Sequence, residues 1–185
     1  MEDYIRVYEN VISSNWCDAL IEKFEDFDDQ HEVFDDELNP LFKRLFIQIN
    51  FGKDLLWKHE SDYLERILLE QVKKYGNDVR LSNQWPSKYT LEPIRMKRYL
   101  PNQKDNFPSH VDVTGTDNNS RFLVMFLYLS DNEKGETIFP QHHFTSKCKQ
   151  GNILIFPSLW PWVHSGNFPV DTPKYIVGSY LHYVD

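Results

Sequence analysis

Two histidines and one aspartate in the second half of the sequence have the residue types and spacing of a metal site. His110 and Asp112 are separated by one residue, and His164 lies far downstream. On a strand, His110 and Asp112 would point to the same face, and His164 would have to come from another strand. Two histidines and one carboxylate leave three positions open on one side of Fe(II), which is the ligand set of non-heme iron oxygenases.

A lysine that follows ten residues after His164 could add an anion site. A hairpin of that length could return Lys174 to the same cavity. Each residue also has a simpler explanation, because His164 could be a hydrogen-bonded core histidine and Lys174 a surface charge. A His-x-Asp pair alone often arises by chance. The joint pattern of the pair, the distant histidine and the lysine is what indicates a metal site beside an anion site.

The composition predicts one folded domain with free thiols. The chain has 185 residues, of which 41% are hydrophobic and 15% aromatic, enough for a sizeable core. Cys17 and Cys148 have no CxxC partner, which indicates a reducing compartment. We see no apolar segment typical of a signal peptide or a membrane span. We therefore expect a soluble, cytoplasmic protein with no membrane partner, whose oligomeric state is left open.

The formal net charge of −8 disfavours nucleic acid as a partner, because non-specific binding needs a basic surface. No run rich in lysine and arginine opposes this charge. The acidic residues at 25–29 could bind a cation or a basic partner, but a solvated loop is the simpler interpretation. The partner that we expect is a protein, a peptide or a small molecule.

The N-terminal part, residues 1–78, is predicted to be mainly helical. A short strand is expected over residues 4–10, and Ser13 can cap a helix in which apolar residues recur at helical spacing. Residues 39–51 are ambiguous, and we favour a helix because apolar residues recur every four positions. Residues 54–75 carry the clearest helical stripe.

From residue 79 the pattern changes to short apolar runs separated by proline, glycine and polar turns. Strands are predicted over residues 91–100, 107–113, 122–129, 137–140, 144–148, 152–156, 162–165 and 175–183, with a turn over 131–135. Short strands at this spacing indicate a barrel or sandwich of jelly-roll type. The predicted class is α+β: a single domain over residues 1–185, with helices of the N-terminal part packed against one sheet of a jelly-roll core at 79–185.

Several short motifs follow one another in a defined order in this second half. They are Arg98-Tyr99, His110-x-Asp112, Arg121 through Tyr128-Leu129, Gly135-Glu136-Thr137-x-Phe139-Pro140, Gly151-Asn152-x-Leu154-x-Phe156-Pro157, His164-Ser-Gly166 and Lys174-Tyr175. This order resembles the prolyl 4-hydroxylase-like branch of the 2-oxoglutarate/Fe(II)-dependent dioxygenase superfamily. The resemblance covers residues 91–185, about half of the chain, and implies a double-stranded β-helix, which is a jelly roll.

The resemblance implies roles for particular residues. His110, Asp112 and His164 would be the catalytic iron ligands. Lys174 would pair with the distal carboxylate of 2-oxoglutarate, since a buried anion needs a charged partner. Tyr128 or Tyr99 would donate a hydroxyl group to the same carboxylate. We prefer Tyr128, because it follows an apolar strand into the barrel.

The implied reaction is an oxidative decarboxylation coupled to hydroxylation. It would use Fe(II), 2-oxoglutarate and O2, with ascorbate as a reductant, and would release succinate and carbon dioxide. The first substrate hypothesis is a proline in a protein or peptide. The alternatives are the same chemistry on a free amino acid or other small molecule, and a non-catalytic metal-binding jelly-roll module. A nucleic-acid demethylase is disfavoured by the net charge.

Two features depart from the family pattern. The family often has two glycines before Glu136-Thr137, whereas here Lys134 precedes Gly135, which we expect to alter a loop rather than the metal site. The segment Trp160-Pro161-Trp162 is bulkier than expected and could be either a hydrophobic plug or an aromatic lip that faces the substrate. Substrate loops are expected over residues 102–107 and 114–119 and in the acidic segment 25–37.

Overall fold

The computed structural model describes residues 4–35 and 44–184. Its helices are α1 (Ser14–Asp26) and α2 (Lys58–Asp78), with short 3-10 segments η2 (Asp28–Gln30), η3 (Phe51–Lys53), η4 (Leu55–Trp57), η5 (Ser82–Gln84), η6 (Thr116–Asn118), η7 (Pro140–His142) and η8 (Trp160–Trp162). Its strands are β1 (Arg6–Tyr8), β2 (Glu32–Asp35), β3 (Leu45–Asn50), β4 (Tyr89–Leu91), β5 (Arg95–Tyr99), β6 (Phe107–His110), β7 (Arg121–Tyr128), β8 (Asn132–Phe139), β9 (Phe144–Cys148), β10 (Ile153–Pro157), β11 (His164–Gly166) and β12 (Lys174–Tyr183).

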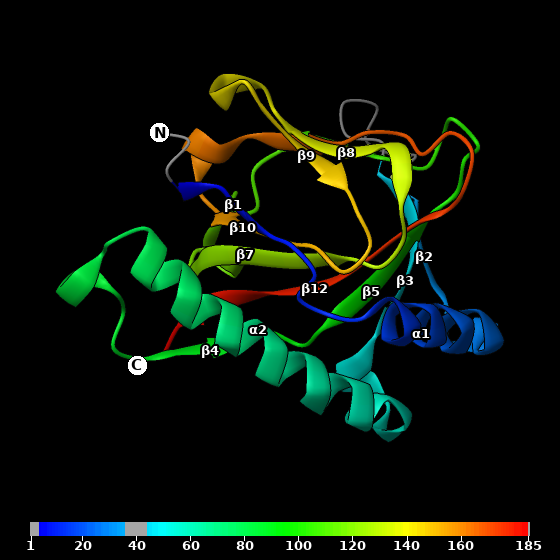
Figure 1. Ribbon diagram of the computed structural model, residues 1–185, viewed down its shortest axis with the longest axis horizontal. Helices are drawn as coiled ribbons and strands as arrows, with labels where there is room; N and C mark the ends of the chain where they lie inside the picture. The colour runs from blue at the N-terminus through cyan, green and yellow to red at the C-terminus, as the bar shows by residue number, and fades with distance from the viewer. Residues whose placement is uncertain (1–3, 36–43, 185) are drawn as a thin grey trace.

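The elements form three layers, as Figure 1 shows: the helices, a large sheet and a small sheet. Among the described residues, the large sheet has the order β1-β10-β7-β12-β5-β3-β2, and β4 also pairs with β12. The small sheet has the order β6-β11-β8-β9. Neighbouring strands run antiparallel, and the two sheets face each other. The predicted α+β jelly roll with helices against one sheet is confirmed.

The strands of the large sheet divide their side chains between two apolar clusters. On β7, Met125 and Leu127 join the cluster that packs against α1 and α2. The alternate residues Val124 and Tyr128 join a second cluster between the two sheets. This alternation follows from the two-residue period of a strand. One face of the large sheet therefore packs against the helices, and the other faces the small sheet.

Both predicted long helices are present. The Ser13 side chain accepts a hydrogen bond from the backbone N–H of Trp16, as expected of an N-cap. The stripe predicted on α2 is buried. This helix begins at Lys58, because the preceding residues form η4, which is capped by the Asp54 side chain. No helix in the described ranges is long and apolar enough to cross a membrane.

The favoured helix over residues 39–51 is wrong where the structure describes it. Leu45–Asn50 is the strand β3, which lies between β2 and β5, and residues 39–43 are outside the described residues. The four-residue apolar spacing fits either structure over so short a segment, and pairing on both edges selects the strand. The turn predicted over 131–135 is also wrong from Asn132 onward, where β8 begins.

The acidic segment is more structured than a solvated loop. Glu25 lies in the last turn of α1, where its carboxylate pairs with Arg98 of β5 and accepts a hydrogen bond of 2.9 Å from the Tyr175 hydroxyl. Both partners belong to the large sheet. Glu25 therefore fastens the end of α1 to the side of the sheet opposite the cavity.

Candidate active site

The two predicted metal-binding histidines are cross-strand neighbours in the small sheet. His110 ends β6 and His164 begins β11, and the two residues are directly paired, with ring centroids 4.2 Å apart. Directly opposed residues of antiparallel strands project side by side from the same face. The strand register therefore brings together two residues that are far apart in the sequence.

Backbone carbonyl groups orient both imidazole rings. Nδ1 of His110 lies 2.8 Å from the Pro108 carbonyl, and Nδ1 of His164 lies 3.1 Å from the Trp162 carbonyl. Since a carbonyl oxygen only accepts, each Nδ1 carries the hydrogen, and Nε2 is the nitrogen that can bind a metal. A backbone carbonyl that fixes the ring in this way prepares histidine for a metal.

Asp112 completes the group from a loop rather than from a strand. The prediction of a strand over 107–113 is wrong for its end, because β6 stops at His110. The Asn118 side-chain amide donates to the Asp112 backbone carbonyl at 2.9 Å and fixes the loop. The Asp112 carboxylate lies 3.7 Å from Nε2 of His110 through Oδ1 and 3.7 Å from Nε2 of His164 through Oδ2.

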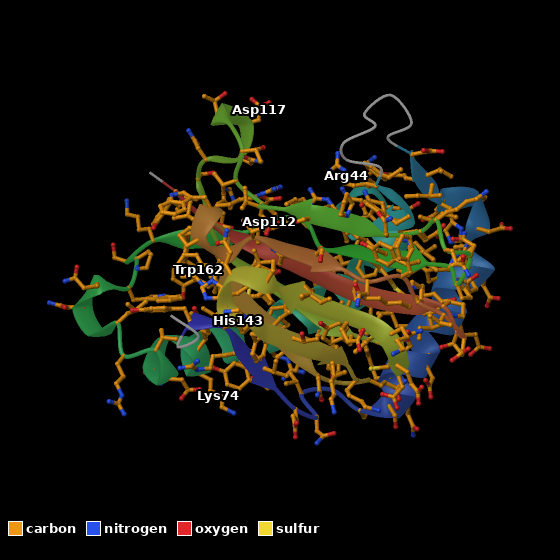
Figure 2. The ribbon with its side chains drawn as sticks, turned by 90° about the horizontal axis from the view of Figure 1, so that it is seen from above. Arg44, Lys74, Asp112, Asp117, His143 and Trp162 are labelled. Atoms are coloured by element: carbon orange, nitrogen blue, oxygen red, sulfur yellow. The ribbon has the colours of Figure 1, made fainter. Side chains whose placement is uncertain are left out.

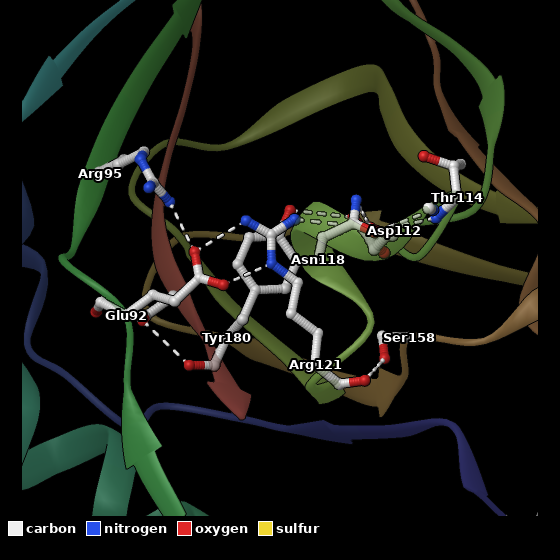
Figure 3. Close-up of polar contacts among 10 residues, drawn as sticks. Glu92, Arg95, Asp112, Thr114, Asn118, Arg121, Ser158 and Tyr180 are labelled. Atoms are coloured by element: carbon white, nitrogen blue, oxygen red, sulfur yellow. Dashed lines mark hydrogen bonds and ion pairs between the residues drawn. The ribbon is translucent and has the colours of Figure 1, made fainter. Parts of the chain in front are cut away.

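A polar chain behind Asp112, shown in Figure 3, positions its carboxylate. The Tyr180 hydroxyl donates to Asp112 Oδ1 at 2.9 Å. The Arg121 guanidinium lies over the Tyr180 ring, 3.9 Å from the centroid, and forms a two-pronged ion pair with Glu92. A ring held between its own strand and a paired guanidinium has little freedom, so the hydroxyl remains directed at the carboxylate.

The buried environment separates the protonation states in the site. Burial raises the pKa of Asp112, but His164, His110 and the Tyr180 hydroxyl outweigh it, and the pKa falls to about 2. Burial lowers the pKa of His164 to about 4, against the opposing effect of Asp112. Burial and Asp112 both raise the pKa of Tyr180, which keeps this hydroxyl a donor. A carboxylate beside the neutral imidazole of His164 is an arrangement that can bind a cation.

The donor set fits a metal ion. One donor atom from each of His110, Asp112 and His164 can be chosen so that all lie within 4.8 Å of one another. Asp112 Oδ2 is buried and has no hydrogen-bond partner among the described residues. A buried carboxylate oxygen without a partner is costly, and a cation would satisfy it. The set of two imidazoles and one carboxylate matches Fe(II) with open positions better than it matches a closed structural zinc site.

Lys174 lies in the same cavity as these three residues. Its side chain is 3% exposed, and its ammonium lies 5.6 Å from the Tyr99 ring centroid and 5.7 Å from that of Tyr128. Within the described part of the chain, the ammonium has no ion pair or hydrogen bond. Burial lowers its pKa. A buried ammonium without an ion pair is costly, and an anion that binds beside it would offset this cost.

The two candidate tyrosines stand differently toward the cavity. Tyr99 lines it, whereas the hydroxyl of the fully buried Tyr128 donates to Thr137 Oγ1 at 2.8 Å. Thr137 in turn lines the cavity. Gly135 makes room at this end, because a Cβ there would come within 3.0 Å of the Lys174 side chain. A side chain at position 135 would therefore crowd Lys174.

The two tryptophans of the Trp160-Pro161-Trp162 segment differ in burial, and the roles of plug and lip both stay predictions. Trp160 is 76% exposed. Trp162 is half-buried and stacks on His142, whose ring N–H donates to the Pro161 carbonyl at 2.8 Å. Trp162 therefore packs on the apolar cluster between the two sheets, and Trp160 is exposed to solvent. Figure 2 shows Trp162 and Asp112 in the central part of the molecule, with Asp117 at the tip of the loop beyond Asp112.

The sequence did not predict a role for Tyr180, Glu92 or Thr137. Tyr180 could have been found, because it lies six residues after Lys174 on one strand, and an even separation puts both side chains on one face. Glu92 carried no such signal, since it comes from the loop between β4 and β5 and reaches the site only through Arg121.

Comparisons with known proteins give structural likeness without sequence likeness. No protein-family model and no curated protein matches the sequence. Among solved structures, a collagen prolyl hydroxylase of Paramecium bursaria Chlorella virus 1, solved as a 2OG complex, matches with a TM-score of 0.72 and 21% identity, covering 98% of this chain and 97% of that one.

Two further matches are cellular prolyl hydroxylases. One is a Trichoplax adhaerens prolyl hydroxylase in complex with a hypoxia-inducible-factor peptide fragment (TM-score 0.74, 13% identity, covering 97% of this chain and 84% of that one). The other is a Pseudomonas putida prolyl 4-hydroxylase (TM-score 0.65, 13% identity, covering 99% and 94%). These solved structures are prolyl hydroxylases, and the described part of this chain has their jelly-roll fold.

Proposed function

We propose that this protein is an Fe(II)- and 2-oxoglutarate-dependent dioxygenase that hydroxylates a prolyl residue of a peptide. The observation that carries the proposal is the pairing of two sites in one cavity. At one end, His110, Asp112 and His164 present donors to a cation, and in the same cavity Lys174 is a buried cation that forms no ion pair with the described residues. A keto acid that chelates a metal and ends in a second carboxylate matches both sites.

In this proposal, His110, Asp112 and His164 hold Fe(II), which supplies the activation of O2 when bound. Tyr180 donates to Asp112 Oδ1 and leaves Oδ2 for the metal. The apolar wall around His164, made by Phe139 and Phe156, limits water at the site. Overall, O2 oxidises 2-oxoglutarate to succinate and carbon dioxide, and one oxygen atom becomes the hydroxyl group of the substrate.

Lys174 is proposed to bind the distal carboxylate of 2-oxoglutarate. The ammonium provides a point charge, and the Tyr99 hydroxyl on the cavity wall can donate a hydrogen bond. Because the Tyr128 hydroxyl already donates to Thr137, Tyr99 is the tyrosine that we now assign to direct contact. Tyr128 then orients Thr137, whose side chain lines the cavity.

A peptide is proposed as the substrate because of the fold neighbours. The Trichoplax neighbour is a complex with a peptide fragment, and the viral neighbour is a collagen prolyl hydroxylase. The competing proposals are hydroxylation of a free amino acid or other small molecule, and a metal-binding module without catalysis. A site that had lost catalysis would be expected to lose a ligand or the lysine, and this chain keeps all four residues.

The test is an anaerobic titration of the apo-protein with Fe(II), with and without 2-oxoglutarate, which follows the visible charge-transfer band of the chelate. We expect a band that is absent in Asp112→Ala and strongly weakened in Lys174→Ala. Iron binding without a band would contradict the oxygenase and leave the metal-binding module. Succinate release in air, with proline-containing peptides and with free proline, then separates the two classes of substrate.

A further inference from the structure

A groove of about 320 Å³ continues from the metal cavity. Small-molecule pockets usually begin near 300 Å³, so the groove can take a side chain or a small substrate. The groove and the cavity share Lys97, Phe107, Val124, Phe126, Ile176 and Tyr180 in their walls. A molecule in the groove would therefore lie against the same side chains that surround the metal ligands.

Lys97 stands at the junction of the groove and the cavity. On β5 it lies two residues before Tyr99 and so shares the cavity face of the sheet. Its cross-strand neighbours are Ile176 on β12 and Gln48 on β3. Lys97 therefore lies two residues along β5 from Tyr99, which is paired with Lys174, on the side toward the groove.

The Lys97 ammonium is held by aromatic rings and not by a carboxylate. It lies 4.7 Å from the Phe46 ring centroid and 5.0 Å from that of Phe107. Among the described residues it forms no ion pair or hydrogen bond. Burial lowers its pKa to about 8, and the charge of Asp112 opposes this effect. A half-buried ammonium that is packed against rings gains from an anion that reaches it.

The groove is cationic although the whole chain is acidic. Arg44, Arg95, Lys97 and Arg121 line it. Arg95 and Arg121 both pair with Glu92, whereas Lys97 forms no ion pair among the described residues. Figure 2 places Arg44 and Asp112 in the same upper half of the view, with Lys74 in the lower half. The local charge therefore favours an anionic group next to the reacting centre.

We propose that Lys97 selects substrates that carry a carboxylate close to the oxidised carbon. The carboxylate could be an acidic side chain beside the target proline in a peptide or the free carboxylate of a small amino acid, and Lys97 would bind either in the same way. This inference rests on the proposed dioxygenase function and specifies its substrate class. Lys174 remains the proposed partner of the co-substrate, because it is more deeply buried than Lys97 and its ammonium lies near the rings of Tyr99 and Tyr128.

The first experiment measures binding, not activity. Fluorescent nine-residue peptides with a central proline flanked by glutamate, glutamine or lysine are titrated anaerobically into the Fe(II)/2-oxoglutarate complex, and anisotropy gives Kd. We expect the glutamate peptide to bind about tenfold more tightly than the glutamine peptide, as one charge-assisted hydrogen bond allows. Lys97→Gln should remove this preference and Lys97→Glu should reverse it in favour of the lysine peptide.

The matched control is Lys147→Glu, which makes the same charge change at an exposed position on β9 outside both cavities. It should keep the wild-type preference. A glutamate preference that survives in Lys97→Gln would overturn the proposal, as would equal binding of all peptides by the wild type. Loss of preference together with a lower melting temperature in Lys97→Gln is checked with Lys97→Arg, which keeps the charge and must keep the preference.

The second arm uses small molecules, with free proline and N-acetylproline amide as the probes. If no peptide binds, tighter binding of free proline than of the amide, abolished by Lys97→Gln, would support the same carboxylate site with a small substrate. If neither arm shows a dependence on Lys97 while the charge-transfer band forms, the Lys97 proposal fails and the dioxygenase proposal stands. Absence of the band in the wild type would contradict the dioxygenase function itself and the inference with it.

Discussion

The two faces of the large sheet are built from the same strands but differ in chemistry. Toward the helices, Met96, Leu127 and Val177 are fully buried in an apolar cluster. Toward the small sheet, the same strands carry Lys97 and Lys174, which line the cavity beside a second apolar cluster. Both faces help to hold the fold together, and the face toward the small sheet also carries the groups that can bind ligands.

This division means that stability and binding can be altered separately. A strand that is rigidly packed on one face gives its other side chains a fixed position, which a binding site requires. The group of three candidate metal ligands does not follow this rule throughout. Asp112 comes from a loop, and its position depends on Asn118 and Tyr180. The comparison between the two faces therefore predicts which substitutions affect folding and which affect ligands.

The largest expected effect is on the cavity side. Asp112→Ala removes the one negatively charged metal ligand, so we expect loss of Fe(II)-dependent succinate release with a folded protein. The control is Asp62→Ala on the exposed face of α2, outside the cavity, which should be active. Iron titration and circular dichroism measure the two properties. Full turnover by the Asp112 variant would show that the metal site is elsewhere.

On the helix side, Leu127→Ala should reduce the free energy of unfolding by about 2–5 kcal/mol, because it leaves a cavity in a fully buried cluster. Urea denaturation measures this change. At a temperature where the variant is folded, the charge-transfer band should be unchanged, since the side chain points away from the cavity. A large loss of 2-oxoglutarate binding would mean that the two faces are not independent.

Lys174→Ala should weaken 2-oxoglutarate binding by about 1.5–3 kcal/mol, the range of a charge-assisted hydrogen bond. The stability of the apo-protein should not fall, and could rise, because a buried ammonium without a partner is removed. Calorimetry of 2-oxoglutarate binding and urea denaturation give the two values. An unchanged Kd would place the anion site elsewhere.

The stability of the apo-protein should fall as the pH is lowered from about 6.5 to 4. In this window the unfolded chain protonates His164 near its ordinary pKa of 6.5, whereas burial keeps the folded residue neutral down to about 4. The unfolded state therefore binds more protons, and folding loses free energy. Urea denaturation in the presence of a chelator should show a smaller loss in His164→Asn. An equal slope in both proteins would exclude this residue as the cause.

The smallest effect distinguishes the two tyrosines. Tyr99→Phe should weaken 2-oxoglutarate binding by about 0.5–1.5 kcal/mol, the net value of one hydrogen bond. Tyr128→Phe should have less effect on the affinity, because its hydroxyl donates to Thr137 and not into the cavity. Parallel calorimetric titrations measure both. The opposite order would restore Tyr128 as the direct donor.

The candidate ligands could be predicted because few residue types bind metals and because the spacing of His110, Asp112 and His164 fits a metal site. His110, Asp112, His164 and Lys174 were all identified as candidates, and the structure brings them into one cavity. The strand at 45–50 could not be predicted, because six residues do not distinguish a helical from an extended apolar pattern. Pairing with β2 and β5 decides that this segment is a strand. β5 is distant in the sequence, and β2 carries no clear strand pattern.

By itself, the sequence determined the jelly-roll class, the metal-binding residue types and the candidate anion partner, because these follow from local alternation and side-chain chemistry. Only the tertiary structure decided that His110 and His164 are cross-strand neighbours, that Tyr180 holds Asp112, and that Lys97 opens into a cationic groove. The physical reason is that strand register, loop closure and local charge are non-local. They depend on which strands pair, and no short segment encodes that choice alone.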